Sequence, residues 1–272
     1  MKIKDHFLTQ ETFELKETAT TGVFRTFPIP QDLEKYYDTP EYISHHQDTG
    51  SPKERLYKLL QKYNLKYKKS ILDNNLKPNA TVLDYGCGAG EFLKFIERDY
   101  NTIGYEPNSV ARKFAAEKAQ KTEITADIES IEDGSLDAIT LWHVFEHIEN
   151  QQETLQIFKD KLKENGLLII AVPNSTSFDA EYYKEFWAAY DVPRHIFHFT
   201  KSGMEKLMNT RIWKIKNIKP LYLDSFYISM LSEKYKNSRL IWLKGLFYGA
   251  ISNLKALKSG EFSSLIYVIE KK

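Results

Sequence analysis

Three glycines in a stretch of five residues are the first feature of this sequence that could serve chemistry. Gly86, Gly88 and Gly90 lie within TVLDYGCGAGEFLKF, residues 81–95. The apolar run before them predicts a β-strand, and the run after them predicts a helix. Glycine lets the backbone adopt positive φ and approach a ligand closely. Because a plain strand-to-helix turn rarely needs three glycines, the loop predicts a ligand site.

The spacing of the glycines separates the possible ligands. A phosphate-binding P-loop would end in Gly-Lys-Ser/Thr, whereas this loop continues Ala89-Gly90-Glu91. A dinucleotide fingerprint, GxGxxG, would need glycine where Glu91 stands, and an acid at a helix start would oppose a pyrophosphate. An NAD-dependent oxidoreductase is therefore a distant alternative.

The remaining possibility rests on a resemblance. VLDYGCGAG, residues 82–90, resembles the DxGxGxG loop of the class I S-adenosylmethionine (SAM)-dependent methyltransferases. SAM has no phosphate, and its ammonium suits a nearby carboxylate such as Asp84, while the glycines would pass beneath the adenosine. The resemblance implies methyl transfer from SAM, with S-adenosylhomocysteine as the product.

Two further acids follow the next two predicted strands. Glu106 lies in IGYEPNS, where the resemblance implies a hydrogen bond to both ribose hydroxyls, and Asp127 lies in TADIES, where it implies a contact to the adenine amino group. The backbone N–H of Ile128 would meet a ring nitrogen. Three acids in this order, each at a strand end, argue against coincidence. The full predicted cofactor site is Asp84, Tyr85, Gly86, Cys87, Gly88, Gly90, Glu106, Pro107, Asp127, Ile128, Trp142, His143, Tyr42 and His45.

The elements that must position these residues alternate from Ala80 onward. Short apolar runs separated by amphipathic stretches predict an α/β, doubly wound, mostly parallel sheet with helices on both faces. The resemblance implies seven strands in the order 3-2-1-4-5-7-6 with the last strand antiparallel, and SSLIYVIEK near the C-terminus suits that strand. We expect an N-terminal cap over residues 1–77 and a methyltransferase domain over 78–272. Acceptor-side insertions are expected at about 174–200 and 231–257.

Three segments refine the resemblance. LDAITLWHVFEHIEN, residues 136–150, resembles the ubiquinone-biosynthesis-like O-methyltransferase branch, and YYDTPEYISHH and DVPRHIFHFT resemble uncharacterised bacterial members of it. This favours a hydroxyl oxygen as the methyl acceptor. The Asn/Asp-Pro-Pro-Tyr/Phe run of the adenine amino-methyltransferases is replaced here by WHVF, which argues against an adenine N6 acceptor.

A methyl group on a sulfonium is already activated, so the enzyme must align it with the acceptor and remove a proton from a hydroxyl. Histidine is the natural base near neutral pH. In PRHIFHF, residues 193–199, we predict His195 as the base, with His198 as the alternative and Arg194 orienting an anionic acceptor or closing the loop through Asp191. A purely structural role, tying the loop to backbone carbonyls, is equally open.

The HxxEH pattern of His143, Glu146 and His147 could gather metal ligands on one helical face. Because Mg²⁺ prefers oxygen ligands and His143 replaces an acid, a divalent metal is possible but not favoured. The preferred interpretation is that His143 lines the SAM pocket while the other two residues form hydrogen bonds within the loop.

Composition limits the partners. The 38 basic and 37 acidic residues give a net charge of +1, without the broad basic field that binds duplex nucleic acid. The lone cysteine, Cys87, excludes an internal disulfide, and neither a signal peptide nor a membrane span is evident. We expect a cytoplasmic methyltransferase acting on a small molecule, whose YYDTPEYISHH segment closes over the methionine end of SAM through Tyr42 and His45. The alternative is a SAM-binding regulatory module that has lost catalysis.

Overall fold

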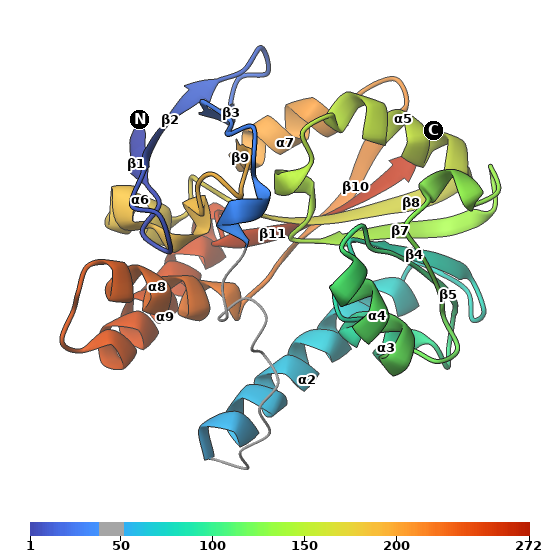
Figure 1. The fold of residues 1–272 in the computed structure, drawn as a ribbon, viewed down its shortest axis with the longest axis horizontal. Coiled ribbons are helices and arrows are strands. Elements are labelled where there is room, and N and C mark those ends of the chain that lie inside the picture. The colour runs from blue at the N-terminus through green and yellow to red at the C-terminus, as the bar shows by residue number, and fades with distance from the viewer. Residues whose placement is uncertain (38–51) are drawn as a thin grey trace.

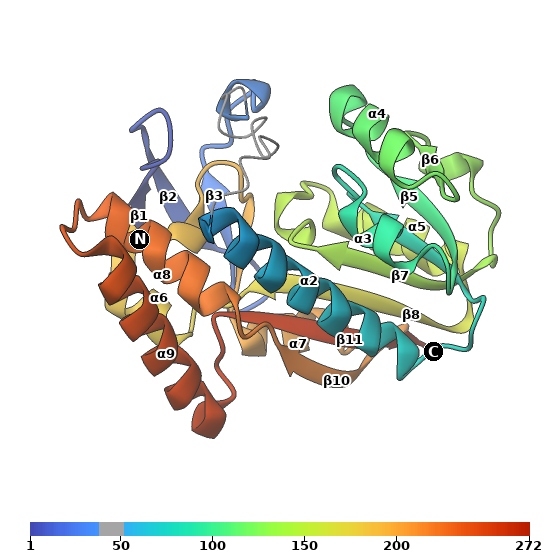
Figure 2. The same cartoon turned by 90° about the horizontal axis from the view of Figure 1, so that it is seen from below.

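The computed structural model of the chain describes residues 1–37 and 52–272. A seven-stranded sheet forms its centre, in the order β10-β11-β8-β7-β4-β5-β6 (Figures 1 and 2). The strands are β4 (Thr81–Tyr85), β5 (Asn101–Tyr105), β6 (Glu123–Thr125), β7 (Leu136–Trp142), β8 (Leu162–Pro173), β10 (Trp213–Pro220) and β11 (Ser264–Lys271). Strands β4 to β8 pair in parallel, while β11 runs antiparallel to both of its neighbours. The predicted fold class and strand order are confirmed.

Helices cover both faces of this sheet, so its central strands are buried on both sides. β8 ends in a run of eight consecutive buried residues, GLLIIAVP, as expected of a strand with no solvent face. On one face, α2 (Pro52–Asp73) and α3 (Glu91–Ile96) pack in a core that includes Leu72, Phe92 and Ile96. On the other face, α5 (Gln151–Lys161) and α7 (Lys201–Met208) supply Phe158 and Met204. α4 (Ser109–Lys118) packs through Ala115 beside the glycine loop.

The first 27 residues form a second sheet with a strand from much later in the chain. β1 (Lys2–Lys4), β2 (Thr12–Glu17) and β3 (Val23–Phe27) are antiparallel, and β3 pairs with β9 (Phe197–Phe199). The order β1-β2-β3-β9 therefore joins the N-terminal segment to the predicted acceptor-side insertion. The division of the chain at residue 77 stays a prediction.

Two helices lie beside this second sheet at one end of the molecule (Figures 1 and 2). α8 (Asp224–Tyr235) and α9 (Ile241–Ser259) pack against each other, with α6 (Phe178–Tyr183) next to them. The sequence predicted one helical region over about 231–257, whereas the structure has two helices, of which α8 begins earlier, and they are separated at residues 236–240. No helix in the described ranges combines the length and apolar character that crossing a membrane requires.

Candidate active site

The glycine loop follows β4 at the carboxyl end of the parallel strands, where ligands of open α/β sheets bind. All three glycines have positive φ, but they serve different needs. A Cβ on Gly86 would lie 2.7 Å from the Val144 side chain, and one on Gly90 would lie 2.9 Å from the Ala115 backbone. A Cβ on Gly88 would meet no atom of the described residues within 4 Å. Gly86 and Gly90 are therefore required for packing, whereas Gly88 borders open space.

Asp84 ends β4 beneath this loop, buried and 3% exposed. Its Oδ1 accepts a hydrogen bond from the Thr140 hydroxyl at 2.6 Å. Burial raises the pKa of Asp84 to about 7, although Thr140 and the Lys68 ammonium favour the charged form. An approaching cation favours the ionised form of such a buried carboxyl, and the ammonium of an amino acid would be such a cation.

Glu106 joins the loop to the end of the neighbouring strand. Its Oε2 accepts from the Gly88 N–H and its Oε1 from the Asn108 N–H, both at 2.9 Å. Pro107, the next residue, is exposed. The Glu106 carboxylate therefore fixes the loop conformation. Its contact with the ribose stays a prediction.

Asp127 and Ile128 lie where the third strand ends. Asp127 is exposed and its Oδ1 accepts from the Glu129 N–H at 3.0 Å, which caps a short 3₁₀ turn, and Ile128 is half-buried. Behind the glycine loop, the rings of Tyr85 and Tyr105 stack 4.4 Å apart. Cys87 is buried, and burial with the nearby carboxylates raises the pKa of its thiol far above the usual range. Cys87 is therefore a neutral packing residue rather than a nucleophile.

Trp142 ends β7 and meets a lysine that the sequence analysis missed. The Lys68 ammonium of α2 lies 4.6 Å from the centre of the Trp142 ring, whose Nε1 is buried without a hydrogen-bond partner among the described residues. Burial lowers the pKa of Lys68, while Asp84 and Asp224 oppose that shift. The signal was available in the sequence: Lys68 occupies the same helical stripe as Ile71 and Leu72, so a lysine interrupts the buried face of α2.

His143, the next residue, is held between two carboxylates. Its Nε2 lies 2.9 Å from Asp224 Oδ2 and its Nδ1 lies 3.3 Å from Glu146 Oε1, so both ring nitrogens donate. Burial alone would lower the pKa of His143, but the Asp224 and Glu146 carboxylates outweigh it and raise the pKa to about 10. A φ of 58° places this non-glycine residue in the left-handed region. His143 is thus an imidazolium and cannot serve as a base.

A cavity of about 490 Å³ adjoins His143 and Asp224. One wall comes from Ala189 and His195 and another from α8, including Tyr227, Ile228 and Leu231. This volume is typical of a site for a small organic molecule. Asp84 in β4 and Asp224 in the cavity lining both favour the charged form of Lys68.

His195 presents a neutral ring to the cavity. Its Nδ1 lies 2.9 Å from the Ala189 carbonyl oxygen, which can only accept, so Nδ1 carries the proton and Nε2 keeps a lone pair. Nε2 is 3.9 Å from Glu146 Oε1. Burial, and after it the effect of the neighbouring His147, lowers the pKa of His195 to about 4. The ring is therefore neutral at pH 7.

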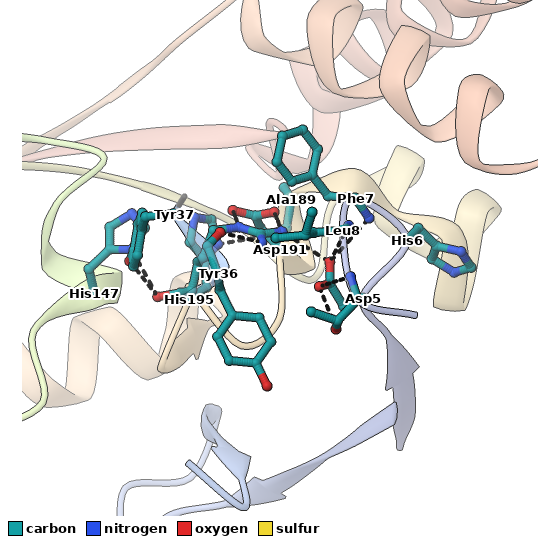
Figure 3. Close-up of polar contacts among 12 residues, drawn as sticks. Asp5, His6, Phe7, Leu8, Tyr36, Tyr37, His147, Ala189, Asp191 and His195 are labelled. Carbon is teal, nitrogen blue, oxygen red and sulfur yellow. Dashed lines mark hydrogen bonds and ion pairs between the residues drawn. The ribbon is translucent and has the colours of Figure 1, made fainter. Parts of the chain in front are cut away.

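Arg194 is buried and already bound by protein groups. Its guanidinium donates to Asp191 at 2.6 and 3.0 Å, to Asp5 at 3.2 Å and to the Tyr36 carbonyl at 3.1 Å. Figure 3 shows Asp5, Asp191 and His195 in this contact network, which continues to His147. Of the two roles predicted for Arg194, closing the loop through Asp191 is the one that these contacts describe.

His198 lies behind the cavity wall in β9. Its Nε2 donates to the Thr26 hydroxyl at 2.8 Å, because that hydroxyl in turn donates to the His195 carbonyl at 2.7 Å. Burial lowers the pKa of His198 well below its usual value. His198 is not among the residues that line the cavity. The strand begins only at Phe197, and the centres of the His195 and His198 rings lie 6.4 Å apart.

The remaining predicted residues are the N-terminal pair of the cofactor site and the possible metal ligands. Tyr42 and His45 fall outside the described residues. One ligand atom each from Glu146, His147 and His195 lies within 4.8 Å of the others, whereas His143 is occupied by two carboxylates. Glu146 Oε2 is buried without a hydrogen-bond partner in the described parts of the chain. The His143, Glu146 and His147 pattern therefore does not form a metal-ligand set of its own.

Comparison with known proteins decides the family. A family model described as a methyltransferase domain matches residues 53–213, more than half of the chain. The chain belongs to this methyltransferase family. Membership, together with the class I methyltransferase fold, confirms the predicted superfamily and its cofactor, SAM.

Among sequence relatives of this methyltransferase, an uncharacterised protein of Methanocaldococcus jannaschii is 28% identical over 180 residues, covering 62% of this chain and 67% of its own. A ribosomal protein L11 methyltransferase of Cupriavidus necator is 39% identical over 74 residues, which is 25% of this chain and 24% of that protein.

The fold is shared with solved methyltransferases of low identity. A putative sarcosine dimethylglycine methyltransferase from Galdieria sulphuraria superposes with a TM-score of 0.53 at 14% identity, covering 79% of this chain and 87% of that chain. Coclaurine N-methyltransferase, solved with N-methylheliamine and S-adenosylhomocysteine, gives 0.52 at 15% identity, covering 77% and 72%.

Proposed function

We propose that this protein transfers a methyl group from SAM to a hydroxyl oxygen of a small or medium acceptor bound in the cavity between His195 and α8. The observation that carries the proposal is the neutral His195 ring, which lines a cavity of about 490 Å³ and whose Nε2 carries no proton.

The residues present suit SAM. Gly88 leaves open space in which an added Cβ would meet nothing, and Trp142 Nε1 is a buried donor without a partner among the described residues. Asp84 would receive the ammonium, Glu106 the ribose hydroxyls, and Asp127 with Ile128 the adenine. When bound, SAM supplies a methyl group already activated by its sulfonium.

Lys68 adds a role that the motif does not contain. As a cation near Asp84 and Trp142, it is placed to neutralise a carboxylate at the methionine end of the cofactor. Trp142 and His143 would form the wall between the two binding regions. The imidazolium of His143, fixed by Asp224 and Glu146, would keep that wall rigid and polar.

His195 would remove the proton of the acceptor hydroxyl. Its Nδ1–H bond to Ala189 fixes the tautomer that leaves Nε2 free. The imidazolium formed would be stabilised by Glu146 Oε1, 3.9 Å away, and by Asp191. A hydroxyl acceptor needs such a base because a neutral hydroxyl is a weak nucleophile. A base at His195 therefore supports our proposal that the protein belongs to the ubiquinone-biosynthesis-like O-methyltransferase branch, which residues 136–150 resemble.

A panel of phenols, catechols, aliphatic alcohols, amines and activated carbon acids, incubated with SAM carrying a labelled methyl group, tests the proposal. We expect transfer to at least one hydroxyl compound, with His195→Asn inactive on it. Transfer to amines alone would contradict the proposed oxygen acceptor. Tight binding of S-adenosylhomocysteine without transfer to any acceptor would instead indicate a non-catalytic SAM-binding module.

A further inference from the structure

The outward face of α9 is unusually apolar for a helix at a protein surface. Six of its large apolar side chains are between 51% and 68% exposed. They are Trp242, Leu243, Leu246, Phe247, Leu254 and Leu257. We call this set the α9 face. Figures 1 and 2 show α9 at an outer end of the molecule, with α8 behind it.

The α9 face arises because the inner side of the helix carries small residues. Gly245, Gly249, Ser252 and Ala256 are its buried residues. A Cβ on Gly245 would lie 2.8 Å from the Met230 Cα of α8, so the two helices are too close for larger side chains. The usual amphipathic pattern is therefore inverted, and leucines at helical spacing point outward.

The segment that carries the α9 face is strongly basic. Residues 234–259 contain six cationic side chains and no acidic one, in a chain whose overall balance is 38 to 37. The cations are Lys234, Lys236, Arg239, Lys244, Lys255 and Lys258. At 100° per residue, Lys244, Lys255 and Lys258 lie along one edge of the apolar stripe. Apolar anchors with lysines at their border are the pattern of a helix that lies in a membrane interface.

We propose that the α9 face docks on the surface of an anionic lipid bilayer, with its leucines in the boundary of the acyl chains and its lysines among the headgroups. Charge favours an anionic bilayer over a second copy of the chain as the partner of the α9 face. Two α9 faces brought together would place cations against cations with no acid in either segment. An anionic surface pairs with the same residues favourably. This inference does not depend on the identity of the methyl acceptor.

Co-sedimentation with phosphatidylcholine vesicles, with and without phosphatidylglycerol, tests the proposal on the full chain. We expect binding that requires phosphatidylglycerol and weakens with salt. The triple variant Lys244→Gln, Lys255→Gln, Lys258→Gln should bind the anionic vesicles on the order of 100-fold more weakly, since each surface cation contributes about tenfold or less. The matched control, Lys214→Gln, Lys216→Gln, Lys219→Gln, removes three exposed lysines of β10 and should bind as the wild type does.

A second variant removes apolar contacts without changing charge. Leu243→Gln, Phe247→Gln, Leu254→Gln should lose at least about tenfold in vesicle binding. Leu59→Gln, Leu60→Gln, Tyr63→Gln, which alters exposed residues of α2, should not. All variants change exposed side chains, and circular dichroism and the melting temperature verify their folding. Absence of wild-type binding to anionic vesicles, or equal binding by the α9 variants, would overturn the proposal. So would a dimer in sedimentation equilibrium that the α9 apolar variant dissociates while vesicles remain unbound.

Discussion

The cofactor region and the acceptor region of this methyltransferase are built in opposite ways. The glycine loop, Asp84 and the start of α3 come from one continuous stretch, residues 81–96. The cavity draws its walls from Phe7, His143, residues between 188 and 195, and α8. Local sequence thus determines where the cofactor would bind, whereas the proposed acceptor site forms only after distant segments have packed. Substitutions should therefore affect chemistry, stability and cofactor binding to different extents in the two regions.

The largest effect is expected at His195, on the acceptor side. With an acceptor in hand, His195→Asn should reduce the single-turnover rate by a factor of roughly 10² to 10⁴. SAM affinity should not change, because the glycine loop is untouched. His198→Asn is the matched control, since His198 is buried against Thr26 and should affect stability more than rate. Equal rate losses in both variants would remove the base assignment.

Asp5 tests whether the N-terminal strands hold the acceptor region together. Asp5→Asn leaves the Arg194 guanidinium, 1% exposed, short of a charged partner. Because Arg194 keeps Asp191 as a charged partner, the loss is that of a hydrogen bond to a charged group, about 1.5–3 kcal/mol, and the free energy of unfolding in urea should fall by that order. Asp32→Asn, at an exposed position, should change it little. A wild-type value for Asp5→Asn would show that the second sheet does not depend on this ion pair.

Glu106 gives the corresponding test on the cofactor side. Glu106→Ala should weaken binding of S-adenosylhomocysteine by roughly 1.5–3 kcal/mol, the range for hydrogen bonds to a charged group. Calorimetric titration measures the change, with Glu117→Ala on the exposed side of α4 as the control. Unchanged affinity in the Glu106 variant would refute the ribose assignment.

The pH dependence of binding should be the smallest effect. Because burial raises the pKa of Asp84 to about 7, the carboxyl is mostly protonated at pH 6 and ionised at pH 8. Affinity for S-adenosylhomocysteine should therefore be about tenfold higher at pH 8 than at pH 6. The ligand-free protein should lose stability over the same rise in pH, since a raised carboxyl pKa favours the folded state only while the group is protonated. Asp84→Asn should bind weakly at both pH values, and a pH-independent wild type would contradict this description of Asp84.

The sequence predicted the sheet that surrounds the proposed cofactor site well for a physical reason. Strand and helix alternate with clear periodicity from Ala80, and parallel strands place their carboxyl ends along one edge. Asp84, Glu106 and Asp127 could thus be placed at neighbouring strand ends before any coordinates were known. Lys68 was missed because a single lysine on a helix is ordinarily read as a solvated residue.

The acceptor region could not be predicted because its contacts are remote in the chain. Arg194 pairs with Asp5 across 189 positions, and β3 pairs with β9 across more than 170. No periodicity links such segments, so the sequence left open whether His195 in PRHIFHF acts as a base or only ties the loop to backbone carbonyls. The structure has a turn followed by a short strand, which leaves His195 at the cavity and His198 behind it.

Binding of S-adenosylhomocysteine to the wild type and to Gly88→Asn is the most direct test of the cofactor site. Asparagine tolerates the left-handed backbone at φ 54°, and its side chain would enter space where the described part of the chain places no atom within 4 Å of the added Cβ. We predict micromolar binding to the wild type by calorimetry and a loss of on the order of tenfold or more, ~1.4 kcal/mol, in Gly88→Asn at an unchanged melting temperature. Absence of binding to the wild type, or equal affinity in the two proteins, would contradict a SAM site at the glycine loop.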